Sequence, residues 1–397
     1  MDEIDQKIFI LLLENPFRSM NDMAKIIGVQ HSAVSSRIDV MKERGFLPKD
    51  QQIHDPILGE RTTSHCVAII NNYELGLIKH HVIFVNIRDK MSVELLEKFF
   101  DFHPYTVYRV QLLGYGISYY AQFAFPPHIA DAMAGLYETL RIKLSISNFF
   151  ILQGEELIDI RPNLFYWGNL ENYWNIVNKK EEEKTKMIDF FWNNYLEEKE
   201  NGVVKTKIMY LNPKYVNISE IQLKLLRELT INGNISISEL STYYDRDKST
   251  ISRHISSIKE KYIKNGILFF KPSEFDLNSF KIITGEIKNE NLDVFKEFLS
   301  SQQFPFYGYI TFNLNKFLMY LVSNHTHLHE IYSFIYPFIV SINEELKLYE
   351  LDLLTSHRYY FYHLNFDEKG IFNTDKKYFY DDPLEELDKL MNTRDVL

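Results

Sequence analysis

The sequence has one cysteine, Cys66, and little glycine or proline. A single thiol excludes an intrachain disulfide and any zinc site built from several cysteines. With 15 glycines and 12 prolines in 397 residues, the chain has no room for long flexible tracts. No apolar run approaches the roughly 18 residues of a membrane helix, and Met1-Asp2-Glu3 is too acidic for a signal peptide. We therefore expect a cytoplasmic protein with no membrane partner.

The usual signatures of catalysis are also missing. There is no phosphate-binding glycine loop, no serine in a nucleophile elbow and no carboxylate pair at a suggestive spacing. The tract His325-Thr326-His327-Leu328-His329 contains metal-ligand residues, but it lies where a loop enters a helix, which favours a surface helix start. We therefore expect no catalytic residue, no metal and no cofactor, and we predict that the chain is not an enzyme.

What the sequence does have is apolar and aromatic side chains, at 45% and 15% of its residues. This is enough for several buried cores, and 397 residues suggest two to four domains. The formal net charge of −10 argues against a uniformly basic nucleic-acid binder, yet it leaves room for a local basic surface.

The chain repeats its own apolar pattern. When the sequence is shifted by 217 positions, apolar residues coincide over about forty residues, as in Ile8 on Leu225, Leu12 on Leu229, Met23 on Leu240, Val34 on Ile251 and Ile38 on Ile255. A second match pairs 82–87 with 282–287 and 93–102 with 292–301, at an offset near 200. The first half therefore holds about 17 more residues between its two modules than the second half does.

Each later module follows the order strand, helix, strand, strand, helix, strand, which is the ferredoxin-like βαββαβ pattern. The predicted fold class is α+β, with two winged helix-turn-helix modules and two ferredoxin-like units in tandem. The expected domains are a winged helix-turn-helix at 1–60, a ferredoxin-like unit at 61–160, a linker with an amphipathic helix at 161–216, a second winged helix-turn-helix at 217–272, a second ferredoxin-like unit at 273–357 and a tail at 358–397 with a short helix after Pro383.

The first 48 residues predict three helices. The first helix spans about 3–14 and ends at Asn15-Pro16. Ser19, followed three residues later by Asp22, has the spacing of a capping box and begins the second helix. Gly28 suits the turn after this helix because a residue without a Cβ readily adopts the left-handed conformation.

Gln30-His31-Ser32 opens a third helix, Gly45 closes it, and Phe46-Leu47 starts a wing strand. This N-terminal pattern resembles the Lrp/AsnC family of prokaryotic regulators. The resemblance is carried by Asp2-Glu3-Ile4-Asp5-Gln6-Lys7-Ile8, Met23-Ala24-Lys25-Ile26-Ile27-Gly28-Val29, Ser32-Ala33-Val34-Ser35-Ser36-Arg37-Ile38 and Glu43-Arg44-Gly45-Phe46, and it continues through Leu75-Gly76. It implies DNA binding, with an α/β domain that in relatives pairs subunits and can bind amino acids.

The chain departs from that family in two ways. Family members usually have one copy of each module, whereas this chain has two. In addition, the loops in the effector position, 112–117 and 312–315, contain no acidic residue for the ammonium group of an amino acid. The resemblance therefore implies self-association through the α/β units but leaves the small-molecule effector unknown.

In such modules the third helix lies in the major groove of double-stranded DNA. The residues expected to contact DNA are Gln30, His31, Ser32, Ser35, Ser36 and Arg37 in the first copy, and Arg246, Lys248, Ser249, Thr250, Ser252, Arg253 and His254 in the second. Residues 217–272 contain nine basic and six acidic residues, a net charge near +3. Residues 1–50 contain seven basic and eight acidic residues, a net charge near −1. The second copy is thus the better electrostatic candidate.

We predict a sequence-specific transcription regulator that acts as a pseudo-dimer or a higher oligomer. Two alternatives stay open. One is a winged-helix protein-interaction factor that binds no DNA. The other is a porphyrin enzyme like the sirohaem decarboxylases, which resemble Lrp/AsnC proteins with two halves and use basic and histidine residues. For that enzyme the opening strand of the first α/β unit offers only His80-His81, with no Arg-His-Arg cluster.

Overall fold

The computed structural model describes residues 1–114, 116–160, 187–202, 208–211, 213, 218–271, 277–301, 306–323, 328–340 and 346–394. The chain forms two compact units. The helical unit comprises residues 1–71, 162–190 and 219–278, and the sheet unit comprises residues 72–161, 191–218 and 279–397. Residues 325–327 of the histidine tract and most of the expected linker lie outside the described residues.

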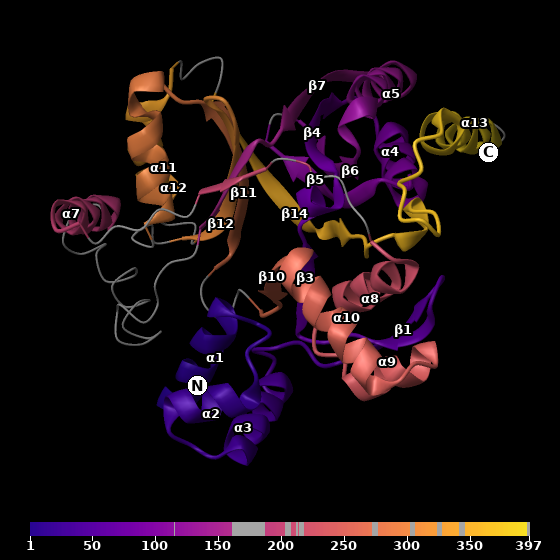
Figure 1. The fold of residues 1–397 in the computed structure, drawn as a ribbon. Coiled ribbons are helices and arrows are strands. Elements are labelled where there is room, and N and C mark those ends of the chain that lie inside the picture. The colour runs from indigo at the N-terminus through magenta and orange to yellow at the C-terminus, as the bar shows by residue number, and fades with distance from the viewer. Residues whose placement is uncertain are drawn as a thin grey trace. The chain divides into compact units, whose positions relative to one another are not determined.

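The first module of the helical unit contains α1 (Glu3–Glu14), α2 (Met20–Ile27) and α3 (His31–Glu43) (Figure 1). The capping signals act as predicted: the Ser19 side chain accepts a hydrogen bond from the Asp22 amide at 3.1 Å, and Gly28 ends α2 with φ 81°. The apolar positions shared by the repeat are buried here, including Ile8 and Val34 at 0% exposure. Local sequence signals therefore specify this module.

The second module contains α8 (Glu220–Ile231), α9 (Ile237–Tyr244) and α10 (Lys248–Lys261). Its repeat-matched residues Leu225, Leu240 and Ile251 are also buried. Instead of a glycine, Asp245 makes the turn between α9 and α10, with φ 48°, a conformation that aspartate tolerates better than most residues. The two modules thus share one skeleton, as the repeat predicted.

The predicted wing differs from the observed one. Residues Phe46 and Leu47 are not a strand, because their amides bond back to the Met41 carbonyl oxygen at 3.0 and 3.3 Å once Gly45, at φ 81°, has ended α3. The hairpin instead consists of β1 (Gln52–Asp55) and β2 (Gly59–Thr62). This hairpin accounts for the extra length of the first half, since α10 leads directly into β10 (Ile263–Leu268).

The two modules are joined by a shared pair of strands. β3 (Cys66–Ile70) of the first half pairs antiparallel with β10 of the second, with Val67 opposite Ile267. Residues 61–71 therefore lie in the helical unit, although the sequence suggested that the first ferredoxin-like unit began at residue 61. The difference arises because β3 finds its partner about 200 residues away along the chain, a pairing with no local sequence signal.

The sheet unit contains both predicted ferredoxin-like units. The first runs β4 (Ile78–Ile87), α4 (Lys90–Phe102), β5 (Thr106–Leu113), β6 (Ser118–Phe125), α5 (Ala130–Lys143) and β7 (Ile146–Gln153). The second runs β11 (Ser279–Glu286), α11 (Leu292–Ser300), β12 (Tyr307–Asn313), β13 (Lys316–Ser323), α12 (Leu328–Ile335) and β14 (Lys347–Arg358). Their strand orders, β7-β4-β6-β5 and β14-β11-β13-β12, confirm the βαββαβ prediction.

Each ferredoxin-like unit gives a strand to the other. The end of β14 pairs with β5, with Leu351 opposite Leu112, while β8 (Glu156–Ile160) leaves the first unit and pairs with β12, with Ile158 opposite Ile310. With β9 (Ile208–Tyr210) at one edge, these pairings make a single ten-stranded sheet. The two halves of the chain are thus joined reciprocally, as two subunits would be in a strand-exchanged dimer.

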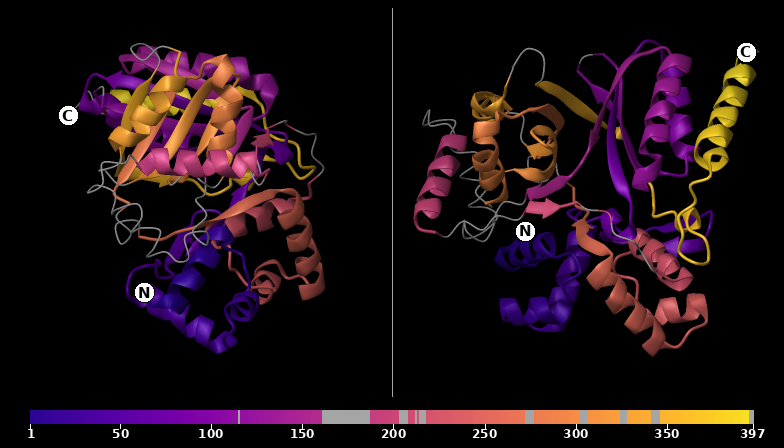
Figure 2. Two further views of the ribbon diagram at one scale, coloured as in Figure 1. Left: turned by 90° about the vertical axis from the view of Figure 1, so that its left-hand side faces the viewer. Right: turned by 45° about the horizontal axis from the view of Figure 1, so that its top comes forward.

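Two extra helices pack outside the helices of the ferredoxin-like units (Figures 1 and 2). The predicted amphipathic helix, α7 (Met187–Glu200), packs on the second unit, where the Trp192 ring lies 4.9 Å from that of Phe298. The predicted C-terminal helix, α13 (Asp382–Arg394), packs on the first unit, where Leu387 joins its buried core. None of the described helices combines the length and apolar composition needed to cross a bilayer.

Between the two ferredoxin-like units lies a second core that both of them build. Ile83 and Val110 from the first unit meet Ile282 and Leu318 from the second. Polar groups are satisfied there within the protein. The hydroxyls of Tyr120 and Tyr309 lie 3.1 Å apart, the Gln122 amide donates to both, and His81 Nδ1 lies 2.7 Å from the Tyr120 hydroxyl. This buried network favours one arrangement of the two units.

Candidate nucleic-acid interface

The predicted DNA-contacting residues all lie outside the buried face of their helices. Gln30, His31, Ser32 and Ser36 are exposed at the start of α3, and Ser35 and Arg37 are half-buried. In and before α10, Arg246, Lys248, Ser249, Ser252 and Arg253 are exposed, and Thr250 and His254 are half-buried. The opposite faces are anchored by buried Val34, Ile38, Ile251 and Ile255. Each third helix therefore presents a polar surface to a ligand.

On α3, both cationic side chains are already paired with carboxylates. Arg37 Nη1 lies 2.6 Å from Asp2 Oδ2 and 2.6 Å from Asp5 Oδ1, and hydrogen bonding, first to Asp2 and then to Asp5, raises the pKa of Arg37. Lys42 Nζ lies 2.9 Å from Asp50 Oδ2. A DNA phosphate would have to compete with these carboxylates for either cation.

On α10 the cations are arranged differently. Among the described residues, no carboxylate pairs with Arg246, Lys248 or Arg253. The hydroxyls of Ser249 and Thr250, however, donate to the Asp247 carboxylate at 2.5 and 2.7 Å, and these hydrogen bonds, that of Ser249 first, lower the pKa of Asp247. Because a hydroxyl has one proton to donate, Ser249 and Thr250 cannot donate to a phosphate without leaving this cap. The cations are the better candidates for contact.

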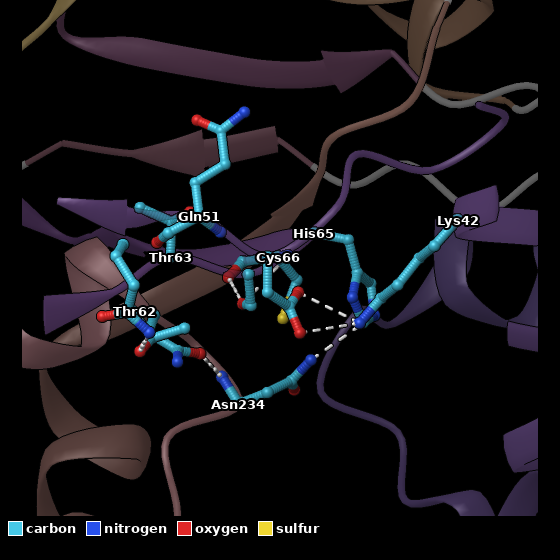
Figure 3. Close-up of polar contacts among 11 residues, drawn as sticks. Lys42, Gln51, Thr62, Thr63, His65, Cys66 and Asn234 are labelled. Atoms are coloured by element: carbon cyan, nitrogen blue, oxygen red, sulfur yellow. Dashed lines mark hydrogen bonds and ion pairs between the residues drawn. The ribbon is translucent and has the colours of Figure 1, made fainter. Parts of the chain in front are cut away.

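The two modules meet around His65, Cys66 and Asn234 (Figure 3). The Cys66 carbonyl accepts a hydrogen bond from the Gly233 amide at 2.9 Å, and His65 Nε2 lies 3.4 Å from Asn234 Nδ2. Burial, followed by the charge of Lys42, lowers the pKa of His65 to about 4, and burial raises the pKa of the Cys66 thiol to about 12. A neutral imidazole and a protonated thiol make this a structural junction, not a nucleophilic site.

Two ion pairs, one half-buried and one buried, attach the β1–β2 hairpin to the second module. Arg61 Nε donates to both carboxylate oxygens of Glu228 at 2.9 Å, and the Tyr244 hydroxyl donates to Glu228 at 2.8 Å. Arg227 Nη2 lies 2.5 Å from Asp55 Oδ2, with both side chains at most 5% exposed. Sequence reasoning missed these pairs because the partners lie 167 and 172 residues apart. They hold the two modules as one body.

A second polar cluster lies in the sheet unit, at the pairing of β5 with β14. The Arg109 guanidinium contacts Glu97 at 2.8 Å and Asp101 at 2.9 Å, and the strand register places it opposite His357. Arg358 follows on β14, where burial lowers its pKa to about 10. Strand pairing thus brings one arginine, Arg109, beside one histidine, His357, whereas Arg358 is the next residue on β14 and its side chain points to the other face of the sheet.

Comparison with known proteins identifies the N-terminal segment. Residues 1–42 match the model of the AsnC-type helix-turn-helix domain. Solved single-module regulators match a smaller part of the chain: an AsnC-family regulator from Agrobacterium tumefaciens at 20% identity (38% of this chain, 89% of that one, TM-score 0.27) and E. coli AsnC at 17% (38% and 91%, TM-score 0.27). A search of curated proteins finds no significant match.

One solved structure covers nearly the whole chain. The sirohaem decarboxylase NirDL is 10% identical, with 98% of this chain and 100% of that chain covered and a TM-score of 0.51. A complex of the same enzyme with an iron-uroporphyrin III analogue gives a TM-score of 0.52 over the same coverage. Our prediction that the chain is not an enzyme is therefore wrong, because its whole fold is one that an enzyme uses. The N-terminal helices match the AsnC-type helix-turn-helix domain of the Lrp/AsnC regulators, and the fold of the chain as a whole is similar to that of this decarboxylase.

Proposed function

We propose that the chain is a sequence-specific DNA-binding transcription regulator whose two modules act as a pseudo-dimer within one polypeptide. The observation that carries the proposal is the outward face of α10, where Arg246, Lys248 and Arg253 are exposed and have no carboxylate partner among the described residues. Arginine and lysine on a helix that enters the major groove supply both phosphate contacts and guanine recognition.

Two further features support DNA binding. The helices carry an AsnC-type helix-turn-helix domain at residues 1–42, and the residues that anchor each third helix are buried. In addition, the β3–β10 pairing and the buried Arg227–Asp55 pair hold the two modules as one body. Because the arrangement of the two modules is fixed before binding, less conformational entropy is lost when both approach one duplex.

The test is capture of genomic DNA fragments by the purified full-length chain, followed by affinity measurements on an enriched fragment. A regulator is expected to enrich a defined set of sequences, and its binding constant should fall linearly on a logarithmic scale as salt rises from 50 to 200 mM. Scrambled duplexes of equal length serve as the control. No enrichment over bulk DNA, together with salt-independent retention, would contradict the proposal.

A second candidate is a porphyrin-binding enzyme. It is favoured by the likeness of fold to a sirohaem decarboxylase over 98% of the chain and by the pairing of Arg109 on β5 with His357 on β14. Guanidinium groups suit the carboxylates of such a ligand, although Arg109 is already paired with two carboxylates of its own. The test is the absorbance spectrum after addition of iron-uroporphyrin. A shifted Soret band that His357→Ala abolishes would support this candidate, and an unchanged spectrum would remove it.

A further inference from the structure

The two modules differ in how much of their polar surface is available. Given the DNA binding proposed above, on which this inference rests, we infer that the two modules share the contact with DNA unequally. The second module makes most of the contact with the duplex through α10, whereas the first module makes fewer contacts and supports the second.

The repeat allows the two third helices to be compared position by position. A shift of 217 residues places His31 on Lys248 and Ser36 on Arg253, so the two exposed cations of α10 have neutral equivalents on α3. Over their full lengths, α10 contains four basic residues and one acidic residue, whereas α3 contains two of each. The attraction of the phosphate backbone is therefore concentrated on α10.

The same comparison shows that the arrangement around Arg37 is particular to the first module. Asp2 and Asp5, which hold the Arg37 guanidinium at 2.6 Å, correspond to Ser219 and Gln222 in the second module. The carboxylates that neutralise a cation in the first module are therefore replaced by uncharged residues in the second. A phosphate that took Arg37 would leave two carboxylates unpaired beside the DNA, so contact there gains little free energy.

The β1–β2 hairpin of the first module is also committed within the protein. Both ends of the hairpin are attached to α8 of the second module, Asp55 through Arg227 and Arg61 through Glu228. The Arg61 guanidinium lies 4.3 Å from the ring centre of Tyr243 on α9 as well. A hairpin held in this way supports the second module, and its arginine is not available to a phosphate.

Matched charge removals in the two modules test the inference. Lys248→Ala/Arg253→Ala removes two exposed cations from the second module, and Lys25→Ala/Arg44→Ala removes two exposed cations from the first. Lys25 lies on α2, the helix that crosses the DNA backbone when such a module docks. Each full-length variant is titrated with a captured fragment at several salt concentrations, after circular dichroism has shown wild-type helix content.

The second-module variant is expected to bind about tenfold more weakly or worse. Its salt slope should fall by about 1.8, which corresponds to two lost phosphate contacts at about 0.9 each. The first-module variant is expected to retain the wild-type slope and to bind within about threefold of the wild type, since only long-range attraction is lost. Equal losses in the two variants, with the wild type binding DNA, would overturn the inference and leave the proposed function intact. A wild-type chain that captures no DNA would overturn both.

Discussion

Three histidines of the sheet unit, His80, His81 and His103, are buried at 3–4% exposure, and acidification is expected to destabilise that unit. Burial lowers the pKa of His80 to about 4 and that of His103 to about 3, and it lowers the pKa of His81 well below 6.5. His103 shows why. Its Nε2 lies 3.0 Å from the Phe379 carbonyl oxygen, while Nδ1 accepts a hydrogen bond from the Tyr105 amide at 3.3 Å. A proton on Nδ1 would face that amide hydrogen.

The sign and size of the effect follow from proton linkage. Because each folded-state pKa lies below the ordinary value of about 6.5, the neutral histidines contribute full stability above that pH, and the contribution is lost as pH falls toward 4. His80 and His103 each take up about one proton on unfolding between pH 5.5 and 4.5, which is worth about 1.4 kcal/mol per pH unit. Together they give a slope of about 3 kcal/mol per pH unit in this window, and His81 acts in the same direction.

The assay is urea unfolding followed by circular dichroism at pH 7.0, 5.5, 5.0 and 4.5. His103→Gln keeps a donor and an acceptor but does not titrate, so the pH dependence of its unfolding free energy should be shallower than wild type by about 1.4 kcal/mol per pH unit. His128→Gln, at an exposed position, is the control and should keep the wild-type slope. If His103→Gln and wild type show the same slope, His103 is not held neutral in the folded protein and the reasoning is refuted.

Two further pairs of substitutions test the packing of the helical unit and of the sheet unit. Glu228→Ala leaves the half-buried Arg61 guanidinium without a carboxylate and should cost about 3 kcal/mol of stability. Glu3→Ala, which removes an exposed ion pair, should cost less than about 1 kcal/mol in the same thermal unfolding experiment. Gly308→Ala should destabilise the sheet strongly, because the new Cβ would lie 2.0 Å from a carbonyl oxygen of β13. By contrast, Gly135→Ala in α5 meets no atom within 4 Å and should stabilise the protein by about 0.5–1 kcal/mol. If the melting temperature moves in the same direction for both glycine variants, the predicted difference between a crowded Gly308 and an open Gly135 is contradicted.

The helices and the βαββαβ pattern of each ferredoxin-like unit could be predicted because their signals are local. Ser19 and Gly28 mark the ends of α2 through hydrogen bonds and dihedral angles that involve only neighbouring residues. The repeat then carries the same prediction to the second module. The wing strand was placed wrongly at Phe46 because a Gly45 that ends a helix and a glycine that precedes a strand look alike in sequence.

The sequence predicted which residues of α3 and α10 face outward, but it did not predict which of their charges are paired. Apolar spacing along α3 and α10 was enough to identify the outward residues. The availability of Arg37, however, depends on Asp2 and Asp5, which lie 35 and 32 residues away and approach only when α1 packs against α3. The position of Arg61 depends in the same way on Glu228. Long-range ion pairs leave no periodic pattern in a sequence, so the sequence offered Arg37 as a DNA contact without revealing that two carboxylates hold it.

Duplication within one chain explains how such an asymmetry can exist. In a symmetric dimer every substitution occurs in both modules, so a change that pairs a recognition arginine with carboxylates weakens both DNA-reading helices at once. In this chain the first half carries Asp2 and Asp5 while the second carries Ser219 and Gln222, and one module can lose cations that the other keeps. The crossing of β8 and β14 holds the halves together by strand pairing inside a single polypeptide. A decarboxylase has a similar fold, so the fold alone does not indicate DNA binding. The charges on α3 and α10 decide whether this chain binds DNA.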